Sequence, residues 1–293
     1  MSKYTDELGE DEVIPLYFDK VFKLTFGDYN HVELLNYLLS IVLKKNVKVL
    51  SLLNNELIGD NRMNKKNSVD LVCELDNEFV SIEVNTSFGQ TVIDRNLSFL
   101  FRLESKELKP GCDYKNISKY YQINLNLVDF DGQHFNTCHI KSDNTGKVFS
   151  NLVEIFNINV SYYGKLCYDN NEDELTDEEM AYGIIGTNRK SVIDKITKNN
   201  EVLKEIGNMV KKFSDYDDVI FEYDREKLMM DDMKQVLTEE VTEKVTKEVT
   251  KEVTKEVTKE TTLDIARKMK QAGSNDSFIS EVTGLSIEQI DEL

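Results

Sequence analysis

Hydrophobic and polar residues alternate along two neighbouring runs of the chain, residues 69–75 and 79–85. In the first run Val, Leu or Cys occupies every second position, and in the second run Val and Ile do the same. The dipeptide Asp76-Asn77, made of two residue types common in turns, lies between the runs. Alternation with a period of two on both sides of a short turn predicts a β-hairpin.

The register of this hairpin follows from its turn. If Asp76 and Asn77 are the two turn residues, one face is wholly apolar and must be the core side, and it carries Val69, Leu71, Cys73, Val80, Ile82 and Val84. Asp70 and Glu83 then lie opposite each other on the second face, with Cβ atoms about 4.5–5.5 Å apart. Two carboxylates this close repel each other unless a cation lies between them, and oxygen ligands favour Mg²⁺ or Mn²⁺. The alternative is an ordinary hairpin whose outer face is polar because water covers it.

Helix and strand patterns alternate on both sides of the hairpin. Leucine and valine at spacings of three and four predict a helix over residues 31–45, and apolar β-branched residues predict a strand over residues 47–53. A long helix that carries Arg95 and Arg102 is expected to end near Pro110. Further helices are expected over residues 19–26, 180–185 and 191–213, and further strands over residues 120–130, 138–141 and 148–158. The pattern predicts an α/β domain, a mixed sheet with helices against it.

A four-residue unit repeats between Val241 and Glu260, first as Val-Thr-Glu-Lys and then as Val-Thr-Lys-Glu. On a helix each four-residue step advances about 400°, so the valine stripe drifts by roughly 40° per repeat, unlike a heptad zipper. No Gly or Pro interrupts the repeat, which predicts a helical stalk that joins copies of the chain; a solvated linker is the alternative. The tail has short helix patterns that end at Gly273 and Gly284 and resembles a helix-turn-helix in shape. Residues 276–293 contain no Lys or Arg, so the tail is not expected to bind DNA by itself.

Acidic residues outnumber basic ones by 54 to 36, and the formal net charge is −18. Such a chain disfavours non-specific nucleic-acid binding, so any DNA contact needs a local basic patch or a metal ion. Arg62, Lys65 and Lys66 form the basic cluster nearest the hairpin, which either holds phosphates or only solubilises a loop. No secretion or membrane-insertion pattern occurs, and the 4 cysteines lack metal-binding spacing. A cytoplasmic protein with reduced cysteines and no membrane contact is expected.

Asp70 on one strand and Glu83 to Asn85 on the next resemble the Asp…Glu-x-Lys core of the PD-(D/E)xK nucleases. The form is similar to that of the Rpn family of recombination-promoting nucleases and transposases. The likeness spans most of residues 15–293, with separate signals in the right order. The flanking segments that resemble this family are residues 19–27, Arg95 at the start of the helix after the motif, and residues 108–125.

The resemblance implies a restriction-endonuclease-like mixed sheet flanked by helices, with a C-terminal helical extension. It also implies phosphodiester hydrolysis with Mg²⁺ or Mn²⁺ held by Asp70, Glu83 and the backbone carbonyl of Val84. Asn85 stands where the superfamily has Lys and this family often has Gln. A short neutral amide can orient the attacking water but supplies no charge to the phosphoryl oxygens.

Further candidate residues lie on neighbouring segments. The first core helix of such nucleases can supply an acidic ligand, which makes Glu33 a candidate, and Glu56 follows the first expected strand. Solvent-exposed carboxylates without a metal are the alternative for both. The expected nucleic-acid contacts are Arg62, Lys65, Lys66 and Arg95, and a salt bridge is the alternative for Arg95.

Two functions follow from these expectations. The first is a metal-dependent DNA endonuclease that acts in recombination, on mobile elements or during phage attack. The second is a catalytically weak or inactive nuclease-fold protein that works as an oligomeric or regulatory partner. DNA and further copies of the chain, joined by the repeat stalk, are the expected partners. The expected segments are a disordered N-terminus (1–14), a nuclease core (15–170), a helical cap (171–237), the repeat stalk or linker (238–262) and a small helical hairpin (263–293).

Overall fold

The structure is a computed structural model. It describes residues 8–53, 70–87, 89–107, 113, 115, 117–129 and 132–293. Contacts divide the chain into two compact units, Met1–Arg225 and Glu226–Leu293. Within the described ranges, no helix combines the length and the apolar character that crossing a membrane requires.

The described part of the first unit is built on a six-stranded mixed sheet with strand order β1-β2-β3-β4-β6-β5. Neighbouring strands β3 (Glu78–Asn85), β4 (Lys119–Asn126) and β6 (Val148–Asn159) are parallel. The antiparallel strands are β1 (Ser51–Leu52), β2 (Leu71–Leu75) and β5 (Phe135–Lys141). Parallel β3 and β4 require a crossover connection, and it contains the helix α3 (Gln90–Glu107).

The predicted hairpin is formed by β2 and β3. Leu71 pairs with Ile82 and Leu75 pairs with Glu78, which is the register expected for a two-residue turn. Asn77 in that turn has a φ of 54°, in the left-handed region that Asn adopts more readily than most side chains. The predicted register is therefore confirmed.

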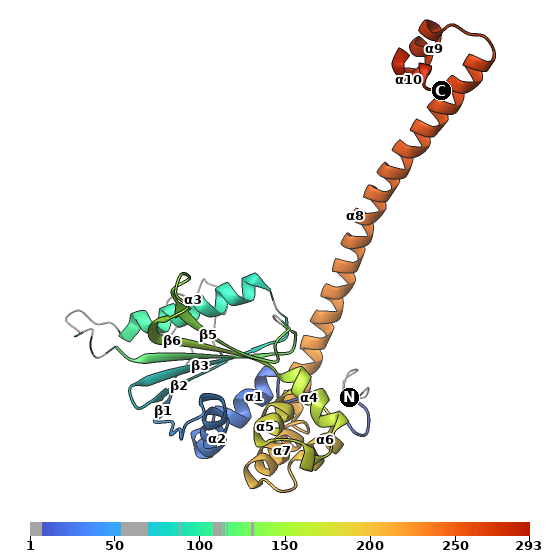
Figure 1. The fold of residues 1–293 in the computed structure, drawn as a ribbon. Coiled ribbons are helices and arrows are strands. Elements are labelled where there is room, and N and C mark those ends of the chain that lie inside the picture. The colour runs from blue at the N-terminus through green and yellow to red at the C-terminus, as the bar shows by residue number, and fades with distance from the viewer. Residues whose placement is uncertain are drawn as a thin grey trace. The chain divides into compact units, whose positions relative to one another are not determined.

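Helices cover both faces of the sheet (Figure 1). α3 lies on the face that carries Val72 and Phe79, where it buries Phe99, Leu100 and Leu103. The polar face of the hairpin is thus covered by a helix and not by water, because two apolar side chains on that face give α3 a surface to pack on.

The main core lies on the opposite face, between the sheet and α1 (Asp19–Phe26) and α2 (Val32–Leu43). Later helices pack into the same core, and they are α4 (Val160–Asp169), α5 (Asp177–Gly186), α6 (Lys190–Ile196) and α7 (Glu201–Phe213). The single helix expected over residues 191–213 is therefore two helices. The second begins at Glu201, and the side chain of the preceding Asn200 caps it by accepting hydrogen bonds of 3.0 Å from the N–H groups of Val202 and Leu203.

Of the N-terminal segment predicted to be disordered, the structure describes residues 8–14, and these residues are ordered. The N–H of Val13 donates to the carbonyl of Asn188 at 2.8 Å, and Val13 and Ile14 are both buried. The acidic composition that suggested disorder ends before these two apolar residues, which pack in the main core.

The second unit is helical. α8 (Asp217–Gln271) begins in the first unit, where Val219 and Tyr223 join the main core, and it contains residues 238–262. The valines of its repeat are 51–55% exposed. α9 (Asp276–Thr283) and α10 (Ile287–Asp291) close a small core with the end of α8, made of Ala266, Ile279 and Ile290.

Candidate active site

Asp70 and Glu83 lie at the open end of the β2-β3 hairpin. Glu83 is only 3% exposed, and its Oε1 atom has no hydrogen-bond partner among the described residues. Asp70 directly precedes β2, and its Oδ2 atom accepts a hydrogen bond of 2.7 Å from the N–H of Val84. This bond fixes the Asp70 carboxylate against the strand that carries Glu83.

Burial raises the pKa of both carboxyl groups. It is the largest cause for Glu83, followed by the charge of Asp70, and the guanidinium of Arg95 lowers the pKa only in part. Burial is also the largest cause for Asp70, where the hydrogen bond from Val84 acts against it and Asp19 raises the pKa further. The site therefore holds two acidic groups whose charged forms are disfavoured by desolvation and by each other.

Arg95, on α3, reaches the end of β3. Its Nη2 atom donates to Asn85 Oδ1 at 2.9 Å, and its Nε atom donates to Asn96 Oδ1 at 3.1 Å. Nη2 is also 3.8 Å from Glu83 Oε2, which is an ion pair but too long for a hydrogen bond. Because the Arg95 side chain is 46% exposed, its guanidinium is open to solvent beside the carboxylates. Arg95 thus brings a positive charge to the end of the strand where Asn85 brings none.

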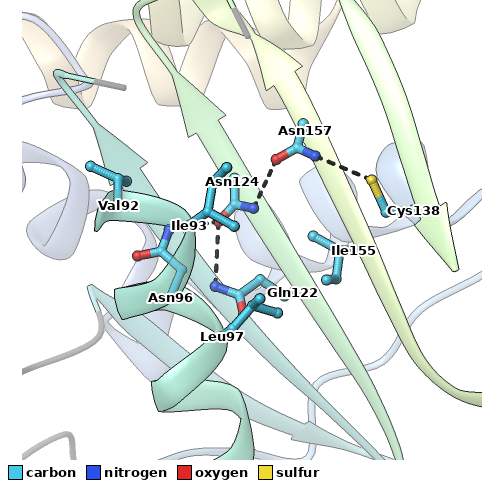
Figure 2. Close-up of a pocket in the computed structure, with 9 residues that line it drawn as sticks. All are labelled: Val92, Ile93, Asn96, Leu97, Gln122, Asn124, Cys138, Ile155 and Asn157. Atoms are coloured by element: carbon cyan, nitrogen blue, oxygen red, sulfur yellow. Dashed lines mark hydrogen bonds between the residues drawn. The ribbon is translucent and has the colours of Figure 1, made fainter. Parts of the chain in front are cut away.

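Buried amides form a row across the sheet beside this site. Asn85 Nδ2 donates to Asn126 Oδ1, and Asn96 Nδ2 donates to Asn124 Oδ1, both at 2.9 Å. Asn124 donates in turn to Asn157 Oδ1 at 2.9 Å. Figure 2 shows Asn96, Asn124 and Asn157 beneath α3, where they line a small pocket. The Asn85 side chain is therefore bonded within the protein, and at 3% exposure it is not presented to solvent.

α1 adds two charged residues, Asp19 and Lys23, to the surroundings of Asp70. Lys23 Nζ lies 2.7 Å from Asp19 Oδ1 and 4.0 Å from Asp70 Oδ1. A hydrogen bond between the side chains of Asp19 and Asp70 is among the causes that raise the pKa of Asp70. The spacing of four between Asp19 and Lys23 was visible in the sequence and predicts that they share a helix face. The approach of α1 to the hairpin is a tertiary contact, and no local pattern indicates it.

The remaining candidates fall elsewhere. Glu33 is exposed on α2, and its carboxylate lies 3.9 Å from His31 Nδ1. The acidic residue that an N-terminal helix brings to Asp70 is Asp19, on α1. Four predicted residues lie outside the described ranges, and these are Glu56, Arg62, Lys65 and Lys66.

The donor atoms at this site fit a hard divalent cation. Such a cation takes carboxylate and backbone carbonyl oxygens, and Glu83 Oε1 is a buried oxygen that has no partner in the described part of the chain. A bound dication reverses the electrostatics, because it favours the charged form of each carboxylate that desolvation and repulsion otherwise disfavour. Asp70, Glu83 and the carbonyl of Val84 are the residues that could hold it.

Comparison with known families supports the resemblance drawn from the motif. The model of a family described as PD-(D/E)XK nuclease family transposase matches residues 16–240, a span that contains the hairpin, α3 and the rest of the sheet. Searches of curated proteins and of solved structures found no match. The mixed sheet with helices on both faces and the long C-terminal helix agree with the expected restriction-endonuclease-like α/β fold, which is confirmed. The chain belongs to the PD-(D/E)XK nuclease family transposases.

Proposed function

We propose that the protein is a metal-dependent DNA endonuclease that hydrolyses phosphodiester bonds. The observation that carries this proposal is Glu83, a buried carboxylate beside Asp70 with an oxygen that has no hydrogen-bond partner within the described residues. Burying two repelling carboxyl groups destabilises the metal-free chain. A divalent cation between them removes that destabilisation, and it is also the cofactor that phosphodiester hydrolysis uses.

In this proposal Asp70, Glu83 and the carbonyl of Val84 hold Mg²⁺ or Mn²⁺. Among the described residues, Asp19 is a further carboxylate beside Asp70, and it takes the place expected of Glu33. When bound, the ion would lower the pKa of a water molecule and stabilise negative charge on the phosphoryl group. The hydrogen bond from the N–H of Val84 holds Asp70 in place in the metal-free chain.

Arg95 supplies the positive charge that the motif lacks at Asn85. Its exposed guanidinium lies beside the carboxylates, where it can donate hydrogen bonds to phosphoryl oxygens. Asn85 and Asn96 accept hydrogen bonds from two different nitrogens of Arg95 and so fix the orientation of its head group. Asn85 therefore positions Arg95, in addition to or instead of orienting water.

A second candidate function is that of a catalytically weak or inactive nuclease-fold protein acting as an interaction partner in the cytoplasm. Asn85 is the observation that favours it. The residue at the position of the motif lysine is buried, uncharged and bonded to Asn126 and Arg95, so it cannot reach a substrate without breaking these bonds.

Plasmid nicking with Mg²⁺ or Mn²⁺ separates the two functions. Wild type is expected to nick, and Asp70→Ala and Glu83→Ala are each expected to lower the rate by roughly 100-fold or more, because each removes a ligand of the ion. Glu33→Ala is the matched control, since it removes an exposed carboxylate on α2, and it is expected to retain activity. Nicking at the wild-type rate by both site variants would contradict the first function, and an inactive wild type would favour the second.

The same assay tests Arg95. Arg95→Ala is expected to nick roughly 100-fold more slowly, the usual effect of removing one donor to a developing negative charge. Arg102→Ala, which removes an exposed arginine from the same helix, is the control and is expected to be close to wild type. Equal rates for the two variants would contradict a role for Arg95 at the phosphoryl group.

A further inference from the structure

A groove opens beside the candidate active site, between α1, the short turn η1 (Tyr29–His31) and α7. Its volume is about 580 Å³, within the range of roughly 300–1,000 Å³ that is typical of small-molecule sites. Lys23 and Lys212 line it together with apolar side chains that include Phe213. Lys23 links the groove to the carboxylates, because its Nζ atom is 4.0 Å from Asp70 Oδ1.

The charged groups of the groove favour an anion. Lys212 is exposed near the end of α7, and Lys23 enters from α1. Asp28 is the acidic residue in the lining, and its carboxylate already accepts hydrogen bonds of 2.9 Å from the backbone N–H and the side chain of Asn30. Lys23 pairs with Asp19 and Asp70 in the metal-free chain.

An aromatic ring stands in the lining of the same groove. Tyr29 is 55% exposed although it is a large hydrophobic residue, and its hydroxyl donates to the carbonyl of Leu50 at 3.3 Å, which holds the ring in place. A fixed, exposed aromatic ring next to ammonium groups is the combination with which proteins bind unpaired nucleotides, because the base stacks on the ring while the phosphate meets the lysines. A base inside a duplex already has both faces covered by its neighbours and cannot stack on a protein ring.

We propose that this groove binds an unpaired nucleotide of the substrate strand, next to the phosphodiester bond that is cleaved. The inference deepens the proposed nuclease function and rests on it: the preferred substrate is single-stranded or locally unpaired DNA. Tyr29 stacks on the base, and Lys212 contacts the phosphate. Lys23 lines the same groove and also lies 4.0 Å from Asp70, so the bound phosphate is next to the carboxylates. The groove thus gives an acidic protein a local nucleic-acid contact without a basic surface.

Binding of labelled oligonucleotides to the full-length protein tests the proposal without cleavage. Fluorescence anisotropy in EDTA would compare a single-stranded thymidine oligonucleotide with a duplex of the same length. Lys212→Ala is expected to weaken single-strand binding by roughly 3- to 10-fold and to lower the salt dependence by about one phosphate contact. Lys211→Ala is the control, because Lys211 is adjacent in sequence but pairs with Asp194 and does not line the groove.

The aromatic contact is tested in the same way. Tyr29→Ala is expected to weaken single-strand binding by roughly 5- to 100-fold, the usual effect of losing one stacked base. Tyr168→Ala removes another exposed tyrosine, which packs on Arg189, and is expected to change binding little. Circular dichroism of each variant would show that the fold is retained.

The outcomes distinguish this inference from the nuclease function. Equal binding by the Lys212 and Lys211 variants, unchanged binding by Tyr29→Ala, or equal losses on duplex and single strand would overturn the proposed nucleotide site. Nicking that depends on Asp70 and Glu83 would leave the nuclease function intact in that case. Conversely, binding that depends on Lys212 and Tyr29 in a protein that does not nick would support the groove and contradict the cleavage step.

Discussion

Glu83 lies in surroundings that disfavour its negative charge. Desolvation is the largest cause of its raised pKa, and the neighbouring charge of Asp70 is the second. Arg95, at 3.8 Å from Oε2, offsets only part of both effects. In the absence of a metal ion, Glu83 is therefore a residue whose charge opposes folding, and a neutral side chain of the same shape relieves that opposition.

Thermal stability as a function of pH tests whether the charge of Glu83 opposes folding in the metal-free chain. The pKa of Glu83 in the folded chain lies above the value of about 4.3 expected in the unfolded chain. Between these two values the folded chain keeps a proton that the unfolded chain releases, so the free energy of unfolding falls as the pH rises. Glu83→Gln has no carboxyl group at this position, so it does not lose stability in this way. In EDTA its Tm is expected to exceed that of wild type at pH 8 by roughly 2–4 °C or more, and the difference is expected to disappear near pH 4.

A control on the same hairpin makes the comparison specific. Glu74 Oε2 accepts a hydrogen bond of 2.9 Å from Ser51 Oγ, so Glu74→Gln is expected to give no increase in Tm at pH 8. A Glu83→Gln protein that is less stable than wild type at pH 8 would contradict the claim that the metal-free site opposes the charge of Glu83.

At the scale of elements, the β2-β3 hairpin was predictable because its causes are local. Alternation fixes which side chains share a face, and the two residues of the turn fix the register, so the pairing of Leu71 with Ile82 follows from the sequence alone. The same alternation does not reveal what covers each face. α3 packs on the polar face through Val72 and Phe79, and this packing buries Glu83, whereas the sequence allowed that face to be solvated.

Asp19 and Lys23 could not be predicted as partners of Asp70, because they come from an element that is distant in the sequence. Lys23 and Asp19 reach Asp70 only because α1 packs against the end of the hairpin. The spacing of apolar residues predicts the helix that carries Arg95. The hydrogen bond from Arg95 to Asn85 depends on how α3 crosses β3, which that spacing does not indicate. The spacing of hydrophobic residues therefore indicates the helices and strands but not how they pack against one another.

At the scale of the whole molecule, α8 leaves a long apolar stripe exposed. The valines of its repeat are 51–55% exposed. Side chains spaced by four residues form a ridge on the helix surface, and this ridge is inclined by about 26° to the helix axis. Two such ridges interdigitate when the helices cross at about 50°, so contact between copies is expected near a crossing point and not along a coiled coil. We propose that α8 joins copies of the chain into a homo-oligomer.

Sedimentation velocity of the full-length protein measures this association. Wild type is expected to sediment as a species heavier than the 33.9 kDa chain, and Val249→Lys, in the middle of the stripe, is expected to shift it towards the monomer. Thr250→Lys places the same charge on the adjacent position outside the stripe and is expected to leave the assembly intact. A wild type that remains monomeric at every concentration tested would contradict the proposal.

The central claim is that Asp70 and Glu83 form a site for one divalent cation. Calorimetric titration of Mn²⁺ into the metal-free full-length protein tests it most directly, because the signal does not depend on substrate or on catalysis. We predict a site that depends on both residues, with at least a tenfold loss of affinity in Asp70→Asn and in Glu83→Gln, and with Glu74→Gln, on the same hairpin, unchanged. Wild-type affinity in both site variants, or no binding by the wild type, would contradict the account.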